Sequence, residues 1–172
     1  QDFDGSHIKG LLMNMFDSLF PSLLKIDGYL TSLLTPVVKI TKGNTTRSFY
    51  NQNKFEKWRD SHNGGKGWNV KYYKGLGTST SDEGKEYFTG IKEKLIVYEH
   101  CDTSNESIDM AFNKKRPDDR KTWLSKLDRN DALDQDQKRV THTEFINKDM
   151  IFFSNYDVER SIPNLEYFFR HH

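Results

Sequence analysis

The stretch that decides the fold stands at the start of the chain: Gln1-Asp2-Phe3-Asp4-Gly5-Ser6-His7-Ile8-Lys9-Gly10-Leu11-Leu12. Two carboxylates, Asp2 and Asp4, lie two residues apart and come directly before Gly5-Ser6. Acidic groups this close repel each other, and a protein usually tolerates them when a hard cation lies between them. The same aspartates could instead be turn and helix-cap residues, because aspartate favours both positions. The spacing alone leaves both interpretations open.

The residues that follow have the apolar spacing of an amphipathic helix over residues 5 to 20. Asp4 or Ser6 would cap this helix, and Pro21 would end it. The calcium loop of EF-hands also contains D-x-D-G, but aligning Gly5 with its glycine puts Leu11 where the loop requires a glutamate. That class of site is therefore excluded. The apolar positions of the expected helix are Ile8, Leu11, Leu12, Met15, Phe16 and Leu19.

The composition is that of a polar chain long enough to bury one core, or one core and a smaller satellite. The chain has 172 residues, 34% of them hydrophobic, and a formal charge of +1. No apolar stretch reaches membrane-spanning length and no signal peptide is visible, so no membrane partner is expected. Cys101 is the single cysteine, which excludes a disulfide framework within the chain and fits an intracellular reducing compartment.

The rest of the chain alternates short strands and helices, which predicts an α/β layered core. We expect strands over 36–41, 47–50, 68–73 and 95–98, with a turn at Gly43-Asn44. We expect a helix over 52–62 with Phe55 and Trp58 facing inward, and a second helix from a cap at Ser79 or Ser81 to about Lys94. Further helices are expected over 106–112, 117–127 and 143–155. Residues 21–34 are expected to be partly helical, and residues 129–140 to form a flexible connection.

Three further motifs follow the opening stretch. They are Lys71-Tyr72-Tyr73-Lys74-Gly75-Leu76-Gly77-Thr78-Ser79-Thr80-Ser81, then Asp118-Asp119-Arg120-Lys121-x-Trp123-Leu124, then the residues from Phe145-Ile146-Asn147-Lys148 to Ser161-Ile162-Pro163-Asn164. In this order the four motifs resemble eukaryotic-type DNA topoisomerase II over about residues 1 to 164. The resemblance implies a TOPRIM-type layered α/β core with short strands and flanking helices, followed by a helical extension.

The resemblance also implies a domain organisation. Residues 1–36 match the C-terminal part of the TOPRIM domain, residues 37–141 its associated extension, and residues 142–164 the start of the breakage–reunion region. Residues 165–172 depart from the family pattern and receive no function. The resemblance implies that the chain is a fragment, with the ATPase domain, the nucleophilic tyrosine, the first acid of the metal triplet and an upstream glutamate located elsewhere in the full-length parent.

Asp2 and Asp4 match the second and third acids of the D-x-D-x-D triplet that holds a divalent metal in the family. The resemblance therefore implies Mg²⁺ as cofactor, with Mn²⁺ or Ca²⁺ as substitutes, and carboxylate oxygens are the hard ligands that Mg²⁺ prefers. ATP is implied for the full-length parent only. None of the eight tyrosines lies in the family's nucleophile motif, so the chain alone is expected to be catalytically inactive.

Six residues are expected to contact DNA. Arg120 and Lys121 match family positions that contact the DNA backbone, and Arg160 matches an arginine near the cleaved phosphate. Lys74 precedes a glycine-rich turn of a kind that suits an anion, and His7 and Lys9 begin the helix beyond the acids. The alternatives are a solvated helix face in which Arg120 and Lys121 pair with nearby aspartates, an ordinary strand-to-helix turn at Lys74, and a surface histidine at His7.

The sequence thus predicts part of the DNA-cleavage core of an ATP-dependent type II DNA topoisomerase, an isomerase. It would act on double-stranded DNA in the nucleus, as a homodimer in the full-length parent. A non-catalytic DNA-docking or structural module, with the acids as turn and cap residues, is the alternative. A TOPRIM domain of the primase or nuclease kind is disfavoured, because the motifs at 71–81 and 145–164 resemble those of the topoisomerase.

Overall fold

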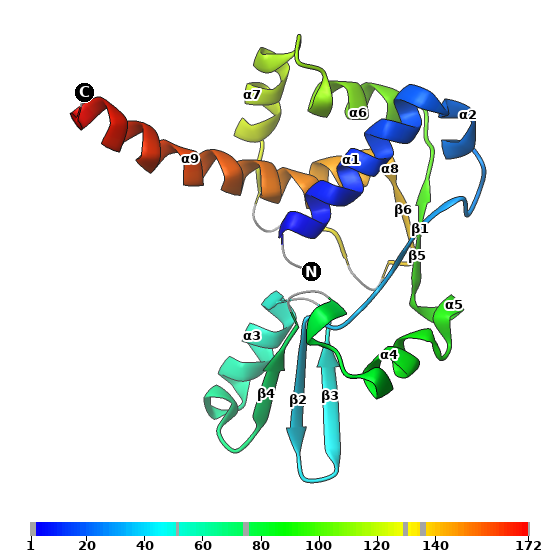
Figure 1. Ribbon diagram of the computed structural model, residues 1–172, viewed down its shortest axis with the longest axis vertical. Helices are drawn as coiled ribbons and strands as arrows, with labels where there is room; N and C mark the ends of the chain where they lie inside the picture. The colour runs from blue at the N-terminus through cyan, green and yellow to red at the C-terminus, as the bar shows by residue number, and fades with distance from the viewer. Residues whose placement is uncertain (1–2, 51, 74–75, 129–130, 135–136, 172) are drawn as a thin grey trace. The chain divides into compact units, whose positions relative to one another are not determined.

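The structure is a computed structural model that describes residues 3–50, 52–73, 76–128, 131–134 and 137–171 (Figure 1). The chain divides into two compact units. We call Thr31–Ile96 the strand unit. The helical unit combines Phe3–Leu30 with Val97–His172. Among the described helices, none combines the length and the apolar composition needed to cross a membrane.

An antiparallel sheet of three strands organises the strand unit. Strands β2 (Val38–Lys42), β3 (Thr45–Phe49) and β4 (Asn69–Tyr72) lie in the order β3-β2-β4. Helix α3 (Gln52–Ser61) packs on one face, as Figure 1 shows. The core between them consists of Val38, Ile40, Phe49, Phe55 and Trp58. The predicted strands and turn are confirmed, and so is the inward orientation of the two aromatic residues of α3.

The helix predicted from Ser79 or Ser81 to Lys94 is corrected at its start and in its middle. Its N-cap is Thr80, whose hydroxyl accepts a hydrogen bond from the Glu83 amide at 3.3 Å while the Glu83 carboxylate accepts one from the Thr80 amide. This reciprocal pair is a capping box, which a threonine three residues before a glutamate can form. Helix α4 (Ser81–Phe88) ends before Gly90, whose φ of 67° breaks the helix, and α5 (Ile91–Lys94) follows.

The helical unit contains most of the remaining elements. They are α1 (Phe3–Leu19), α2 (Pro21–Leu24), α6 (Ser104–Phe112), α7 (Pro117–Ser125), α8 (His142–Phe145), a π-helical turn η3 (Ile146–Met150) and α9 (Ile151–His171). Strands β1 (Leu30–Leu33) and β5 (Leu95–Glu99) each contain residues of both units. Strand β5 pairs in parallel with β6 (Arg139–Thr141), and the sheet has the order β1-β5-β6. Strand β6 begins in the last residues of the segment predicted as a flexible connection, 129–140, and ends at Thr141. The helix predicted at 143–155 is part of a longer helical run that begins at His142.

Helix α1 begins earlier than predicted, so the capping role expected for Asp4 or Ser6 is wrong. Helix α1 already includes Phe3, and Ser6 lies inside it, 6% exposed, where its hydroxyl donates to Asp149 Oδ1 at 2.6 Å. The backbone of α1 packs closely against Met150 and Phe112 at Gly10. A Cβ atom at this position would lie 2.5 Å from Met150 Sδ and 3.0 Å from the Phe112 ring. A glycine is therefore required where α1 crosses these side chains.

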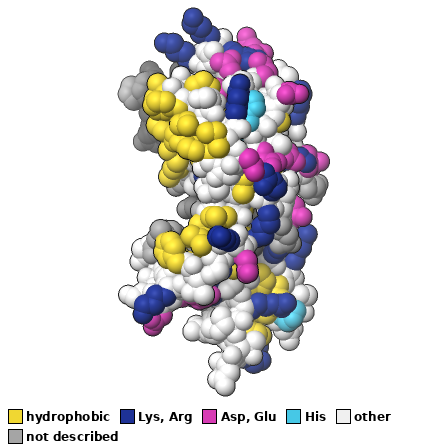
Figure 2. Space-filling model, turned by 90° about the vertical axis from the view of Figure 1, so that its right-hand side faces the viewer, with side chains coloured by type: hydrophobic (Ala, Val, Ile, Leu, Met, Phe, Trp, Pro, Cys, Tyr) yellow, Lys and Arg dark blue, Asp and Glu magenta, His cyan; other side chains and the backbone are white. Residues whose placement is uncertain are grey.

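The apolar stripe that predicted this helix is largely exposed. Met13 is fully buried, but the predicted stripe remains on the surface, and Figure 2 shows hydrophobic side chains gathered on one face of the molecule. The exposed members of the stripe are Ile8, Leu11, Leu12, Met15 and Leu19. The α/β fold with a helical extension is confirmed, whereas the domain boundaries at 36, 141 and 164 stay predictions.

Candidate functional site

The two acids of the opening motif lie at the margin of the described structure. Asp2 is outside the described residues, and only the backbone of Asp4 is described, in the first turn of α1. Within the described part of the chain, no group of three or more His, Cys, Asp and Glu side chains could hold a metal ion. The metal site at Asp2 and Asp4 therefore stays a prediction.

His7 and Lys9 are both engaged with the helices that α1 crosses. The His7 ring stacks on Phe153 with centroids 4.3 Å apart and an angle of 7° between the rings. Lys9 Nζ lies 3.8 Å from Asp149 Oδ2 and 5.6 Å from the centroid of the Phe145 ring. Asp149 is also the residue that accepts from Ser6, so one carboxylate ties two side chains of α1 to the π-helical turn η3.

Arg120 and Lys121 use their charges in different ways. Arg120 Nη1 donates to the carbonyl oxygens of Met110, at 3.3 Å, and Asn113, at the C-terminal end of α6. Carbonyls at a helix C-terminus lack partners within the helix, and a guanidinium stabilises them. Lys121 Nζ forms an exposed ion pair with Asp118 Oδ1 at 2.9 Å. This pair is the arrangement expected under the alternative interpretation of a solvated helix face.

A groove brings three of the predicted residues together. His7, Arg120 and Lys121 line a groove of about 380 Å³ between α7 and α9, with Trp123 and Phe153 among its apolar walls. Asp157 lines the same groove and pairs with Arg160, whose Nη2 lies 2.6 Å from Asp157 Oδ1. Neither Lys9 nor Arg160 lines the groove. The structure thus gathers part of the predicted DNA contacts on one surface.

The basic run at residues 114–116 is partly neutralised within the helical unit. Arg116 pairs with three carboxylates, Glu106 at 2.6 Å, Asp119 at 2.6 Å and Asp109 at 3.0 Å. Hydrogen bonds to Glu106, Asp119 and Asp109 raise the pKa of Arg116 above its usual value. Arg116 therefore connects α6 to α7, and only Lys114 and Lys115 of the run are exposed.

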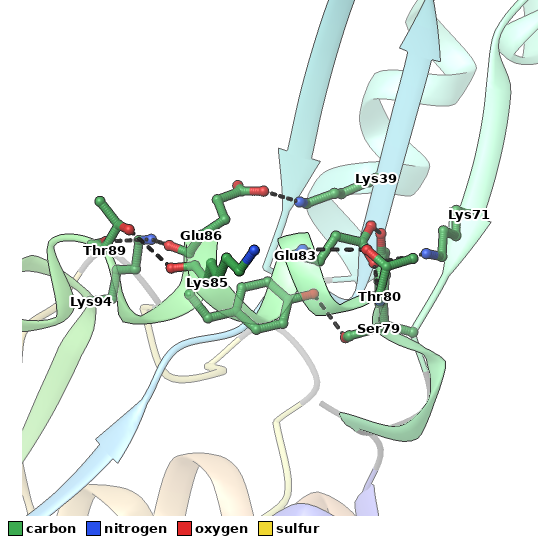
Figure 3. Close-up of polar contacts among 11 residues, drawn as sticks. Lys39, Lys71, Ser79, Thr80, Glu83, Lys85, Glu86, Thr89 and Lys94 are labelled. Atoms are coloured by element: carbon green, nitrogen blue, oxygen red, sulfur yellow. Dashed lines mark hydrogen bonds and ion pairs between the residues drawn. The ribbon is translucent and has the colours of Figure 1, made fainter.

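The second motif is anchored by Glu83, a residue that sequence reasoning did not assign. Lys74 lies outside the described residues, but both flanks of its segment meet at Glu83 (Figure 3). The Glu83 carboxylate accepts from Lys71 Nζ at 2.8 Å, from the Tyr73 hydroxyl and from the Thr80 amide at 2.8 Å. The strand before the segment and the helix after it are thereby fixed to one carboxylate.

These contacts shift the ionisation of the groups involved. Burial by itself would raise the pKa of Glu83, but hydrogen bonds from Lys71, Tyr73 and Thr80 outweigh it and lower the pKa to about 2. Burial and the bond to Glu83 raise the pKa of Tyr73. Glu83 therefore stays ionised at neutral pH. The T-x-x-E spacing of a capping box was the sequence signal that could have identified it.

Helix α4 is held on the polar face of the sheet by a second pair. Lys39 is buried, with 7% of its surface exposed. Its Nζ donates to Glu86 Oε2 at 2.7 Å (Figure 3) and lies 5.6 Å from the centroid of the Tyr87 ring. The Tyr87 hydroxyl lies 3.0 Å from Ser79 Oγ. A buried lysine needs such a partner, because an unpaired buried charge is costly.

A cluster in the helical unit was also missed. His142 is fully buried, and among the described residues neither of its ring nitrogens has a hydrogen-bond partner. Burial, with a smaller repulsion from His100, lowers the pKa of His142 to about 4. Nearby in sequence, Thr143 Oγ1 lies 3.4 Å from Cys101 Sγ. Burial opposes ionisation of the thiol, but hydrogen bonds from Ser104, Thr103 and Thr143 lower the pKa of Cys101 to about 6.

With this geometry described, comparison with known proteins gives the family. Residues 33–158 match TOPRIM_C, the C-terminal associated domain of TOPRIM. The chain belongs to the TOPRIM_C family. It is 48% identical over 166 residues to DNA topoisomerase 2 of Plasmodium falciparum (isolate K1 / Thailand), and 48% identical over 170 residues to DNA topoisomerase 2 of Arabidopsis thaliana. These relatives confirm the resemblance to eukaryotic-type DNA topoisomerase II that the four motifs predicted.

A solved structure supports the same relationship. The chain matches the crystal structure of the Plasmodium falciparum topoisomerase II DNA-binding, cleavage and re-ligation domain with a TM-score of 0.85 and 46% identity. The match covers 93% of this TOPRIM_C chain and 22% of that chain. Against the full relatives, the alignments cover 96% of this chain but only 12% of the P. falciparum and A. thaliana proteins.

Proposed function

We propose that this chain is part of the DNA-cleavage core of an ATP-dependent type II DNA topoisomerase, an isomerase. One observation carries the proposal: the chain matches a DNA-binding, cleavage and re-ligation domain at 46% identity over 93% of its length. Identity at this level over nearly the whole chain supports a shared role as well as a shared fold. The non-catalytic docking alternative lacks a comparable observation.

In this proposal Asp2 and Asp4 hold Mg²⁺. Their donor set fits the cation in its chemistry, because two carboxylates supply hard oxygen ligands and leave positions for water and phosphate oxygen. The described backbone of Asp4 lies in the first turn of α1, where the helix start tolerates an acidic side chain. Bound there, the metal would supply positive charge to a phosphodiester during its cleavage.

The chain's other contribution is to bind the DNA backbone. We propose that His7, Arg120 and Lys121 face the duplex from the groove between α7 and α9, supported by their convergence there. Arg160, Lys9 and Lys74 are proposed contacts on motif grounds. Lys121, Arg160 and Lys9 each lie beside an aspartate, so their contact with phosphate requires an exchange of ion pairs.

Several properties belong to the longer protein in this proposal. A tyrosine located elsewhere in it attacks the phosphodiester, ATP drives its cycle, and two copies act together as a homodimer on double-stranded DNA in the nucleus. These features are proposed from the DNA topoisomerase 2 relatives, of which this chain spans a small part.

The test uses the longer protein that contains this chain. Asp2→Asn should abolish Mg²⁺-dependent cleavage of supercoiled plasmid, because it removes a charged metal ligand and changes little else. Binding of the same plasmid, measured by gel shift in Ca²⁺, should survive. A matched control is Asp60→Asn, which removes an exposed carboxylate in the strand unit. Cleavage by the Asp2→Asn variant at the rate of the control would contradict the proposal and favour a docking role.

A further inference from the structure

The strand unit contains a segment with very few acids. Residues 31–81 contain nine Lys and Arg but only two Asp and Glu, Glu56 and Asp60. The formal charge of the whole chain is only +1, because acidic residues elsewhere in the chain offset this local excess of positive charge. Local positive charge of this kind is what binding to a polyanion requires.

Three of these cations belong to the β2–β3 hairpin or to the turn before β4, and we call them the hairpin surface: Lys42, Arg47 and Lys66. In the register of β2 and β3, Lys42 lies opposite Thr45 and Arg47 lies opposite Ile40. Lys42 and Arg47 are therefore diagonal neighbours on the same face, and such neighbours lie about 7–8 Å apart. All three side chains are exposed.

The turn before β4, which contains the third cation, lies beside Lys42. Lys42 Nζ lies 5.9 Å from the centroid of the Trp68 ring, and a Cβ on Gly67 would lie 3.8 Å from the same nitrogen. Lys66 is the residue before Gly67. Trp68 is itself fixed by Trp58, with ring centroids 5.4 Å apart. The indole thus gives the hairpin surface a rigid base in the core of the strand unit.

The hairpin surface differs from the paired cations of the helical unit, because its charge is not balanced by an ion pair within the described chain. None of Lys42, Arg47 and Lys66 forms an ion pair with a described residue. By contrast, the cations of the helical unit that pair with carboxylates are Lys9, Arg116, Lys121, Arg139, Lys148 and Arg160. An unbalanced cation can neutralise a phosphate without first giving up a partner.

We propose that the hairpin surface is a second DNA-backbone contact, separate from the groove between α7 and α9, and that it supplies much of the salt-dependent affinity of this chain for duplex DNA. The inference rests on the proposed function for its choice of DNA as the polyanion. Contacts of this kind go to phosphate and carry no sequence preference, because they do not reach base edges. An acidic polypeptide is the competing partner that the test must separate.

The test measures binding of the 172-residue chain to a fluorescent 20-base-pair duplex by anisotropy, over a range of salt concentrations. The variant Lys42→Gln/Arg47→Gln/Lys66→Gln removes three charges. Each lost phosphate contact reduces the slope of log affinity against log salt by about 0.9, so a reduction of about two to three is expected. At about 0.1 M salt the affinity should fall at least tenfold.

The matched control is Lys25→Gln/Lys85→Gln/Lys148→Gln, which has the same net charge and lies outside both proposed contact surfaces. It should keep a slope within about one unit of the unmodified chain. Because all substituted side chains of the hairpin variant are exposed, its circular dichroism should be unchanged. Should it nevertheless unfold, the single variant Lys66→Gln, in a surface turn, gives the same test with an expected slope change of about 0.9.

The outcomes separate this inference from the function on which it rests. Equal slopes for the hairpin variant and the control would overturn the hairpin surface, as would absence of DNA binding by the unmodified chain. The proposal would also be overturned if polyglutamate bound the chain more tightly than DNA does and lost its affinity in the hairpin variant. In that case the partner of the hairpin surface would be an acidic polypeptide. The proposed function fails separately, if the longer protein cleaves DNA without Asp2.

Discussion

The strand unit and the helical unit carry opposite formal charge. Thr31–Ile96 contains twelve Lys and Arg against six Asp and Glu, whereas the rest of the chain contains fourteen against nineteen. The helical unit pairs several of its cations with its own carboxylates, and the hairpin surface of the strand unit leaves its cations unbalanced. A basic run in a sequence is therefore a poor guide to free positive charge, because neighbouring acids decide how much of it is available.

The stability of the two units should also respond differently to acid, and this is the largest change in stability that we expect. The pKa of His142 is about 4 in the folded helical unit and about 6.5 in an unfolded chain, so the unfolded chain binds the extra proton between these values. Stability of the helical unit should fall as the pH drops from 6.5 towards 4, by about 2 kcal/mol. Urea unfolding at pH 7.5 and 4.5 measures this loss.

The variant His142→Leu serves as the comparison, since it removes the titrating ring and keeps an apolar side chain in the core. It should show a much smaller loss between the two pH values. The strand unit should not share this loss, because the pKa of Glu83 is held at about 2 and its stabilising contribution is lost only as the pH falls below about 4.5. Equal acid sensitivity of the unmodified chain and the His142→Leu variant would contradict this account.

Two glycines offer a second way to distinguish the units. Gly10→Ala should destabilise the helical unit by about 1 kcal/mol, because the clash with Met150 and Phe112 exceeds the gain in helix propensity. Gly84→Ala in α4 should stabilise the strand unit by about 0.5–1 kcal/mol, since nothing lies within 4 Å of its Cβ position. Hydrogen exchange resolved by residue reports each effect. Stabilisation of the helical unit by Gly10→Ala would refute the contact described at Gly10, and destabilisation of the strand unit by Gly84→Ala would contradict the open space described at Gly84.

Glu83→Gln tests the anchoring of the second motif. The substitution keeps the shape of the side chain but weakens its charge-assisted bonds to Lys71 and Tyr73, and a loss of about 1–2 kcal/mol is expected in the strand unit. Asp82→Asn is the control, because Asp82 pairs with Lys85 at a highly exposed site, and it should cost less than about 0.5 kcal/mol. A variant at Glu83 as stable as its control would show that the three contacts are not stabilising.

The smallest stability effect is expected at the surface pair of α7. Asp118→Asn removes the partner of Lys121, an exposed pair whose loss should change stability by less than about 0.5 kcal/mol. Its effect on DNA binding should be easier to detect, with affinity rising a few-fold because a negative charge is lost and Lys121 is released. Anisotropy with the same duplex measures this change. A fall in affinity would argue against the groove between α7 and α9 as a DNA contact.

The fold was largely predictable because its signals are local. Alternating β-branched residues around Gly43-Asn44 predicted the hairpin, and the spacing of Phe55 and Trp58 predicted the face that α3 buries. The start of α4 was misplaced because Ser79, Thr80 and Ser81 are all capable of capping, and only the position of Glu83 selects Thr80. The helix is interrupted at Gly90 because this residue adopts a left-handed backbone conformation. A single glycine in the sequence does not show that it will adopt this conformation.

The candidate site was less predictable, because side-chain partners come from distant parts of the chain. Arg120 was expected to contact DNA, but its engagement with the C-terminal end of α6 depends on how α6 and α7 pack. The pairing of Lys9 with Asp149 joins residues far apart in sequence. The acid-free surroundings of Lys42 and Lys66 were visible in the sequence, yet a whole-chain net charge of +1 concealed them.

The most direct test of the account is lysine footprinting of the 172-residue chain, with acetylation measured by mass spectrometry in the absence and presence of duplex DNA. Lys42 and Lys66 should be acetylated at least several-fold more slowly when DNA is bound. Lys25, exposed in the helical unit and outside the proposed contacts, should be unchanged and serves as the internal reference. Unaltered acetylation of Lys42 and Lys66 under saturating DNA would contradict the claim that the strand unit presents free positive charge to the duplex.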